Sequence, residues 1–242
     1  MEHISLLQIW SWLGTPVAFM LLFLLFGTKV FQANKDISRW RDAQWIGWLA
    51  VAVIMLHVTE EYGCTVLGQT YAFPEMMLGI LSGALGYSVT LPPEMFPVVN
   101  LTIAFFGIPA VALLANKHPF VLTSTMGLFA LNGMTHLMPC IVMGQINPGV
   151  FTGVFLFIPL SIWYFYAFFA RGEMKVRWGW FIIINGIIVM GILGAAIISY
   201  VTVSIPVALL MFLHCLNAAF LSIVPLLEEK LIGRKRLYKA NS

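Results

Sequence analysis

The sequence predicts an all-α integral membrane protein, a bundle of seven transmembrane helices. Hydrophobic residues make up 60% of the 242 residues and charged residues only 10%, with a mean hydropathy of +0.92. Soluble domains carry about 25% charged residues. Seven stretches are long enough to cross a bilayer, which takes about 20 mainly apolar residues. The composition excludes a soluble enzyme, a disordered protein and a nucleic-acid-binding module, since a soluble surface needs polar cover.

Short linkers separate most of the predicted spans. The expected spans are 6–31, 43–63, 97–115, 121–143, 150–170, 178–204 and 206–227. Between the second and third spans, residues 63–96 contain an apolar, glycine-rich middle bounded by Pro74 and by Pro92 and Pro93. We expect this segment to be an outer loop with a re-entrant or interfacial helix that covers a site. Residues 228–242 are expected to form a basic cytoplasmic tail.

The placement of the basic residues decides between seven spans and eight. With seven spans all 13 Lys and Arg residues fall on one side of the membrane, as the positive-inside rule requires. An eighth span within 63–96 would put the later basic loops opposite residues 35–41. We therefore expect the N-terminus outside, the C-terminus in the cytoplasm, and a location in the plasma (inner) membrane. Residues 1–242 are expected to form a single transmembrane domain.

The second span carries three ionisable residues, His57, Glu60 and Glu61. Ionisable groups inside a membrane span are costly and are functional candidates by default. Residues three and four apart share a helix face, so the three side chains are expected to point roughly the same way. Two adjacent carboxylates repel each other, and a bound cation or a shared proton removes that conflict. The simpler alternative is that the two glutamates only mark the outer interface.

Five polar residues of three other spans fall at a similar depth. At 1.5 Å per residue, His136 and His214 lie slightly outward of the middle of their spans, Asn132 lies near mid-membrane, and Asn217 and Asn100 belong to the same outer-half layer. Spans placed from hydropathy alone had no reason to agree in this way. The agreement favours a polar site in the outer half of the bilayer.

These residues resemble a known family. The string 57–62, His-Val-Thr-Glu-Glu-Tyr, is similar to the signature of the HXXEE membrane-protein family. The Asn-x-x-x-His pattern of 132–136 and the Asn-Pro-Gly turn of 147–149, followed by the apolar run 150–163, add to the resemblance. It covers roughly residues 45–165. The resemblance implies an enzyme on the basis of its polar motif, without a defined reaction.

A weaker similarity is to CPBP-type intramembrane metalloproteases, which combine a Glu-Glu pair with histidines on later spans. Glu60 and Glu61, with His136 and His214, resemble that arrangement. That family's pattern has an arginine four residues after the second glutamate, where this chain has Thr65.

The favoured hypothesis is a membrane-embedded metal enzyme, hydrolase-like, that acts on a lipid-like or amphipathic small molecule. Imidazole and carboxylate ligands suit zinc or iron. His57, His136 and one of Glu60 and Glu61 would be ligands, with His214 as a possible fourth, and the other glutamate would be the general base. The residues expected to orient ligands or to stabilise an oxyanion are Asn132, Asn217 and Asn100.

Two alternatives stay open. Without a metal, Glu60 or Glu61 could act as a general acid in the isomerisation or cyclisation of a prenyl-type substrate. A proton-coupled transporter could use the same carboxylates and histidines as a relay. The expected partners are the lipid bilayer and a lipid-like small molecule, with no nucleic acid.

Overall fold

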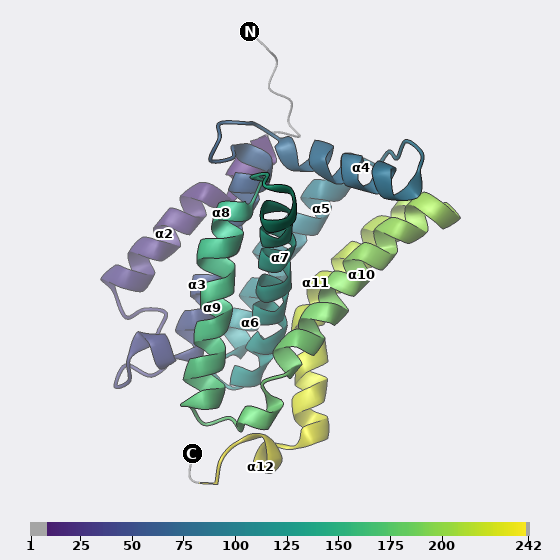
Figure 1. Ribbon diagram of the computed structural model, residues 1–242. Helices are drawn as coiled ribbons and strands as arrows, with labels where there is room; N and C mark the ends of the chain where they lie inside the picture. The colour runs from purple at the N-terminus through teal and green to yellow at the C-terminus, as the bar shows by residue number, and fades with distance from the viewer. Residues whose placement is uncertain (1–8, 241–242) are drawn as a thin grey trace.

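The computed structural model describes residues 9–240 and confirms a helical bundle with seven membrane-spanning helices (Figure 1). The chain is a multi-pass membrane protein. The spans agree with the predicted ones to within a few residues, apart from the last, which extends further: Trp10–Gly27, Ala43–Gly63, Met95–Leu114, Pro119–Val142, Val150–Ala170, Val176–Val203 and Val207–Ile232. Residues 6–8 of the first predicted span lie outside the described part.

Several spans are built from more than one helical segment. The α-helices are α2 (Gly14–Gly27), α3 (Ala43–Val58), α4 (Ala72–Leu85), α5 (Met95–Thr102), α6 (Ile108–Leu114), α7 (Leu122–Met143), α8 (Val150–Thr152), α9 (Ile158–Tyr164), α10 (Phe181–Val203), α11 (Val207–Ile232) and α12 (Arg234–Leu237). Four π-helical segments interrupt them: η3 (Thr59–Gly63), η4 (Ile103–Gly107), η6 (Gly153–Phe157) and η7 (Phe165–Ala170). Such wide turns inside helices often occur at functional sites.

The second span, α3 with η3, is the central helix of the bundle. Of its most apolar stretch 78% is buried, against 28–44% for the corresponding stretches of the other spans. The others therefore present most of their apolar surface outward, where hydrocarbon replaces water as the solvent. The ionisable residues of the central helix are enclosed by protein.

Glycines let the spans approach closely around α7. A side chain at Gly127 would lie within 2.0 Å of the carbonyl oxygen of Ile182 on α10. Gly133 meets the fifth span in the same way, because a side chain there would lie 2.8 Å from the carbonyl oxygen of Gly153. Small residues at helix contacts are typical of membrane bundles. The second contact lies one turn from His136 and holds that part of α7 against the fifth span.

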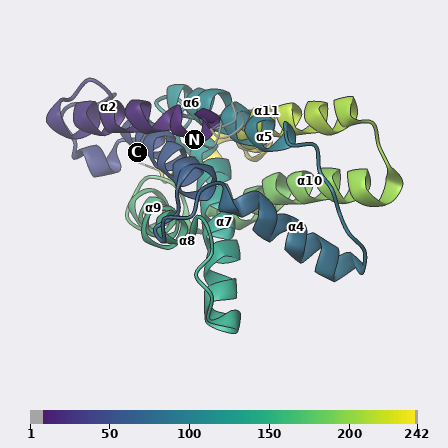
Figure 2. The same cartoon turned by 90° about the horizontal axis from the view of Figure 1, so that it is seen from above.

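The segment 63–96 forms an interfacial helix and not an eighth span. In Figure 1, α4 lies across the ends of the upright helices, and Figure 2 shows it over the side where α7 and α10 lie. Two of its side chains, Phe73 and Met77, line a cavity that also reaches Glu61 and His136. This is the position expected of a segment that covers the site.

The opposite end of the bundle carries the positive charges. The loops and helix ends that hold the 13 Lys and Arg residues all lie at the end of α12 (Figure 1). The last helical span is longer than expected, since α11 continues to Ile232. Tyr238 pairs with Met174 in an isolated antiparallel bridge, which ties the tail to the fifth-to-sixth loop.

The orientation of the bundle can be tested by labelling introduced cysteines. Gln145 and Asn116 are both exposed but lie at opposite ends of α7. In a variant whose native Cys64, Cys140 and Cys215 are replaced by alanine, we expect Gln145→Cys to react with an impermeant thiol reagent added outside intact cells. Asn116→Cys should react only after permeabilisation. The reverse pattern would contradict the predicted N-terminus outside.

Candidate metal centre

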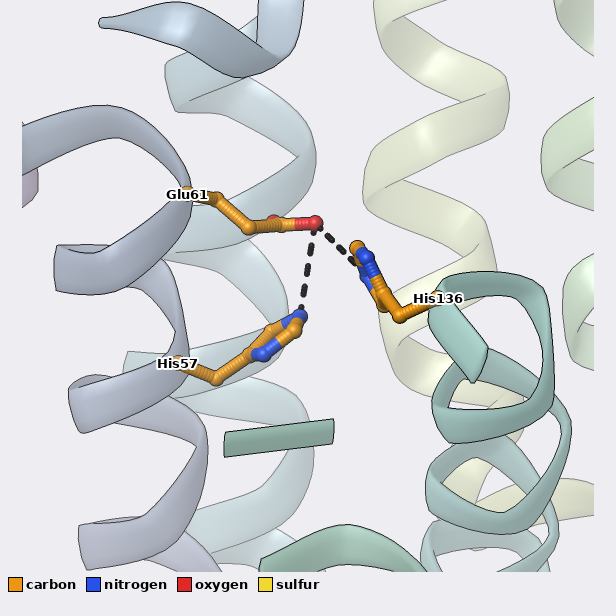
Figure 3. A group of neighbouring side chains, drawn as sticks. All are labelled: His57, Glu61 and His136. Carbon is orange, nitrogen blue, oxygen red and sulfur yellow. Dashed lines mark ion pairs between the residues drawn. The ribbon is translucent and has the colours of Figure 1, made fainter. Parts of the chain in front are cut away.

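Three side chains from two spans converge in the upper part of the bundle. Glu61 Oε1 lies 3.4 Å from His57 Nε2 and 3.1 Å from His136 Nε2. Figure 3 shows His57 and Glu61 on one helix, with His136 approaching from another. All three are buried, each with at most 4% of its surface exposed. We refer to His57, Glu61 and His136 as the cluster.

The local helix geometry separates the two adjacent glutamates. His57 lies in the last turn of α3, and the π-helical turn η3 carries Glu60 and Glu61. Glu61 remains one turn above His57 and reaches the cluster. Glu60 has different partners: its carboxylate accepts the backbone N–H groups of Phe151 and Thr152, at 3.0 and 2.7 Å. Glu60 is therefore held by the fifth span, although the sequence predicted both glutamates at one centre.

Glu60 and Thr152 fix the position of the proton on His57. The Thr152 hydroxyl donates to Glu60 Oε2 at 2.6 Å, and it lies 2.7 Å from His57 Nδ1. A hydroxyl has one proton to donate. Since that proton goes to Glu60, His57 Nδ1 must donate to the hydroxyl oxygen. In the neutral imidazole, Nε2 then carries a lone pair, and it faces Glu61.

Asn147 fixes His136 in the same tautomer. Its amide Nδ2 donates to the backbone carbonyl of His136 at 2.7 Å, so its Oδ1 is the atom that lies 2.8 Å from His136 Nδ1. An amide oxygen only accepts, so His136 Nδ1 is the donor. Nε2 of the neutral ring again carries the lone pair and faces Glu61.

Three acceptor atoms thus meet at one point without a donor between them. The ligand atoms of the cluster lie within 4.8 Å of one another. Acceptors this close repel unless a cation lies between them, either a metal ion or a proton that makes one histidine cationic. Zinc bonds of about 2.0–2.2 Å in a tetrahedron place ligand atoms about 3.3–3.6 Å apart. The separations of 3.1 and 3.4 Å around Glu61 Oε1 are close to that spacing.

Gly149 closes one side of the cluster with its backbone. Its φ of +86° is in the left-handed region, which favours glycine. A side chain at this position would lie 2.8 Å from Glu61 Cγ and from His136 Cε1, and 2.9 Å from His57 Cε1. Only hydrogen fits here. The turn 147–149 therefore supplies both the amide that orients His136 and the glycine that leaves room for the cluster.

The other sequence-predicted residues divide into two groups. Asn100 and Asn132 line the cavity beside Glu61 and His136. Asn217 instead donates to the carbonyl of Val189 at 3.0 Å and joins α11 to α10. Among residues 9–240, His214 is buried without a hydrogen-bond partner on either ring nitrogen, and its ligand atoms do not join the cluster. His214 and Asn217 thus lie apart from the cluster, whereas the sequence predicted them at the same site.

Thr152 and the separate roles of Asn147 and Gly149 were not found from the sequence. Thr152 is a single hydroxyl in the first turn of an apolar span, which is a common place for threonine. The sequence shows the Asn-Pro-Gly turn, but it does not show which residues the turn contacts. The signal available in the sequence was that Thr152 is a polar residue at the start of the fifth span, at the depth of His57.

A comparison with known protein families covers the segment that carries the cluster. Residues 48–164 match the model of a family described as "Protein of unknown function with HXXEE motif". This match confirms, over residues 48–164, the resemblance to the HXXEE family that the sequence motifs indicate. The matched HXXEE segment contains all three cluster residues and also Glu60, Asn147, Gly149 and Thr152. No curated protein and no solved structure matches the chain.

Proposed function

We infer that the chain is a membrane-embedded metal enzyme, hydrolase-like, that acts on a lipid-like or amphipathic substrate. The observation that carries this proposal is the convergence of three lone pairs, with both histidines held in the metal-binding tautomer by their other ring nitrogen. Histidines that bind metals in proteins usually donate that second nitrogen to a fixed acceptor. Two imidazoles and one carboxylate are also the ligand set of catalytic zinc sites that keep an open fourth position.

The cavity beside the cluster supports a catalytic role over a closed structural site. A metal in such a position lowers the pKa of bound water to near neutrality or polarises a substrate oxygen. Asn100 and Asn132 line the cavity next to Glu61 and His136, where their amides can donate to a developing oxyanion. The second carboxylate oxygen of Glu61 is available to accept a proton. The mainly apolar walls suit an amphipathic substrate.

Glu60 takes a positioning role in this proposal and not that of the general base. Its carboxylate accepts two backbone N–H groups and the Thr152 hydroxyl, and only 5% of its surface is exposed. It therefore anchors the first turn of the fifth span and orients His57 through Thr152. Glu61 is left as the carboxylate ligand.

Replacing Thr152 tests this orientation. Thr152→Val keeps the shape of the side chain but leaves His57 Nδ1 without an acceptor, so His57 loses its tautomer preference. Loss of such a supporting hydrogen bond typically lowers metal affinity about 10–100-fold. Thr152→Ser, which keeps the hydroxyl, should bind zinc as wild type does. Titration of chelator-treated protein with zinc measures the difference, and equal affinities for Val and wild type would contradict the role.

Metal analysis of the purified full-length protein tests the proposed function itself. We expect about one zinc or iron per chain, released by a strong chelator and restored by the same metal. Wild type that binds no metal would reject the proposal. The cluster would then hold a proton, with Glu61 and His136 as an acid–base pair, as the isomerase or cyclase hypothesis and the proton-coupled transporter require. Activity that survives treatment with a chelator would favour these two hypotheses.

Within the cell we propose the plasma (inner) membrane, with the basic end of α12 in the cytoplasm. The 13 basic residues at that end support this orientation, since positively charged loops stay on the cytoplasmic side. The cluster then lies in the outer half of the bilayer, and its substrate comes from that leaflet.

A further inference from the structure

The cavity beside the cluster is polar at one end and apolar at the other. It has a volume of about 120 Å³ and is bounded by side chains of α3, α4, α5, α7 and α10. Glu61, His136 and Asn100 form part of its polar end, and Ile54, Leu128 and Met190 are among its apolar residues. A molecule that fills it would have a polar group and a hydrocarbon group at opposite ends.

The apolar end lies deeper in the membrane than the cluster. Ile54 precedes Glu61 by seven residues on the central span, about 10 Å along the helix. Leu128 precedes His136 by eight residues on α7, about 12 Å in the same direction. Both spans run toward the end covered by α4 (Figure 1). The cavity therefore extends from the cluster away from α4, toward the middle of the bilayer.

The size and lining of the deep end limit what it can hold. An apolar cavity of about 150 Å³ accepts a molecule the size of benzene. The whole cavity, its polar end included, has a volume of about 120 Å³, so the deep end has room for one short hydrocarbon group and not for a full lipid chain. Met190, on α10, and Leu128, on α7, are among the residues that line this end.

We propose that this cavity is the binding site for the hydrocarbon arm of the substrate, a single-chain amphiphile. Its polar group lies at Glu61 and His136, and a short alkyl or prenyl arm points from there toward the bilayer middle. Met190 and Leu128 set the length of the arm that fits. The proposal rests on the proposed function for the polar group, whereas the arm's cavity is independent of any metal.

Two series of ligands test the proposal on full-length protein in lipid nanodiscs. The first is n-alkyl hydroxamic acids of increasing length, whose head group chelates a metal, with zinc-loaded protein. The second is n-alkanols of the same lengths, with chelator-treated protein. Each methylene that the cavity covers should tighten binding about fourfold, up to the length that fills it. Calorimetric titration gives the dissociation constants.

Met190→Trp, which fills the deep end, is the variant that decides the outcome. Its matched control is Ile187→Trp, because Ile187 is on the same helix, is 57% exposed and does not line the cavity. Longer alkyl groups also enter lipid more readily, so the quantity compared is the ratio of variant to wild-type affinity at each length, in which partition into lipid cancels. We expect a ratio near one for the shortest ligands, falling tenfold or more for longer ones in Met190→Trp, and unchanged ratios in Ile187→Trp.

The two series separate the cavity from the metal. A falling ratio with both series supports the proposal. A falling ratio with alkanols alone, in protein that binds no zinc, rejects the metal enzyme and still supports the arm's cavity. Ratios that do not depend on length in either series, with Met190→Trp binding as much zinc as wild type, would overturn the proposal.

Discussion

Protein carrying His136→Ala is expected to purify with an intact fold and without bound metal. The substitution removes one of the two imidazole ligands that meet Glu61. Loss of a supporting residue already costs about 10–100-fold in metal affinity, so loss of a ligand should cost more than a hundredfold. His57→Ala should have the same effect. Since a neutral side chain replaces a buried ionisable one, we expect little change in thermal stability of the metal-free protein.

His214→Ala is the matched control for this result. His214 is as deeply buried as the cluster histidines, at 1% exposed, but has no hydrogen-bond partner in the part of the chain that the structure describes. It should keep the full metal content, measured by mass spectrometry of the purified protein. If His214→Ala loses the metal while His57→Ala and His136→Ala retain it, the metal lies elsewhere and the cluster has been misassigned.

Gly149→Ala is expected to abolish metal binding although residue 149 supplies no ligand atom. The new methyl group would lie 2.8–2.9 Å from carbon atoms of all three cluster side chains. These chains cannot move apart without breaking the contacts of His57 with Thr152 and of His136 with Asn147. We therefore expect the loss of metal to match that of the His136→Ala variant.

Gly144→Ala is the control that separates the steric clash of the new methyl group from backbone strain. Gly144 has a similar positive φ of +65°, but a side chain there would meet nothing within 4 Å. Both variants carry the cost of a left-handed alanine, about 1–2 kcal/mol, and both should lose a few degrees in thermal stability. Only Gly149→Ala should lose the metal. Equal metal contents in the two variants would show that the glycine is required for the turn alone.

The spans were predictable because hydropathy and charge constrain them independently. About 20 apolar residues mark a helix that crosses the membrane, and the one-sided basic residues excluded an eighth span in 63–96. The helix inside that segment, Ala72–Leu85, was expected from its apolar middle. Its interfacial course depends on packing over α7 and α10, which composition does not specify.

The sequence predicted the depth of the site residues in the membrane, but not the direction in which each helix faces them. The rise per residue placed His57, His136 and His214 in one layer, and two of the three meet. Which way a helix faces depends on its neighbours, so His214 on α11 turned out to lie apart. The π-helical turn at Thr59–Gly63 directed Glu60 and Glu61 to different partners, whereas regular helix spacing predicted a shared direction.

The residues that hold the histidines come from the segment between the fourth and fifth spans. Asn147 and Gly149 lie in a turn, and Thr152 lies just inside the next span. Turn residues carry no periodic signal, and hydrogen bonds between residues 57 and 152 or 60 and 152 cross more than 90 positions. Such partners become visible only once the chain is folded.

Element-specific anomalous scattering from crystals of the purified full-length protein tests the central claim most directly. Data collected on both sides of the zinc and iron absorption edges identify and locate the metal. The account predicts one peak about 2.0–2.2 Å from His57 Nε2, His136 Nε2 and a carboxylate oxygen of Glu61. No peak between these three atoms in protein prepared with zinc or iron, or a peak at another set of side chains, would contradict it.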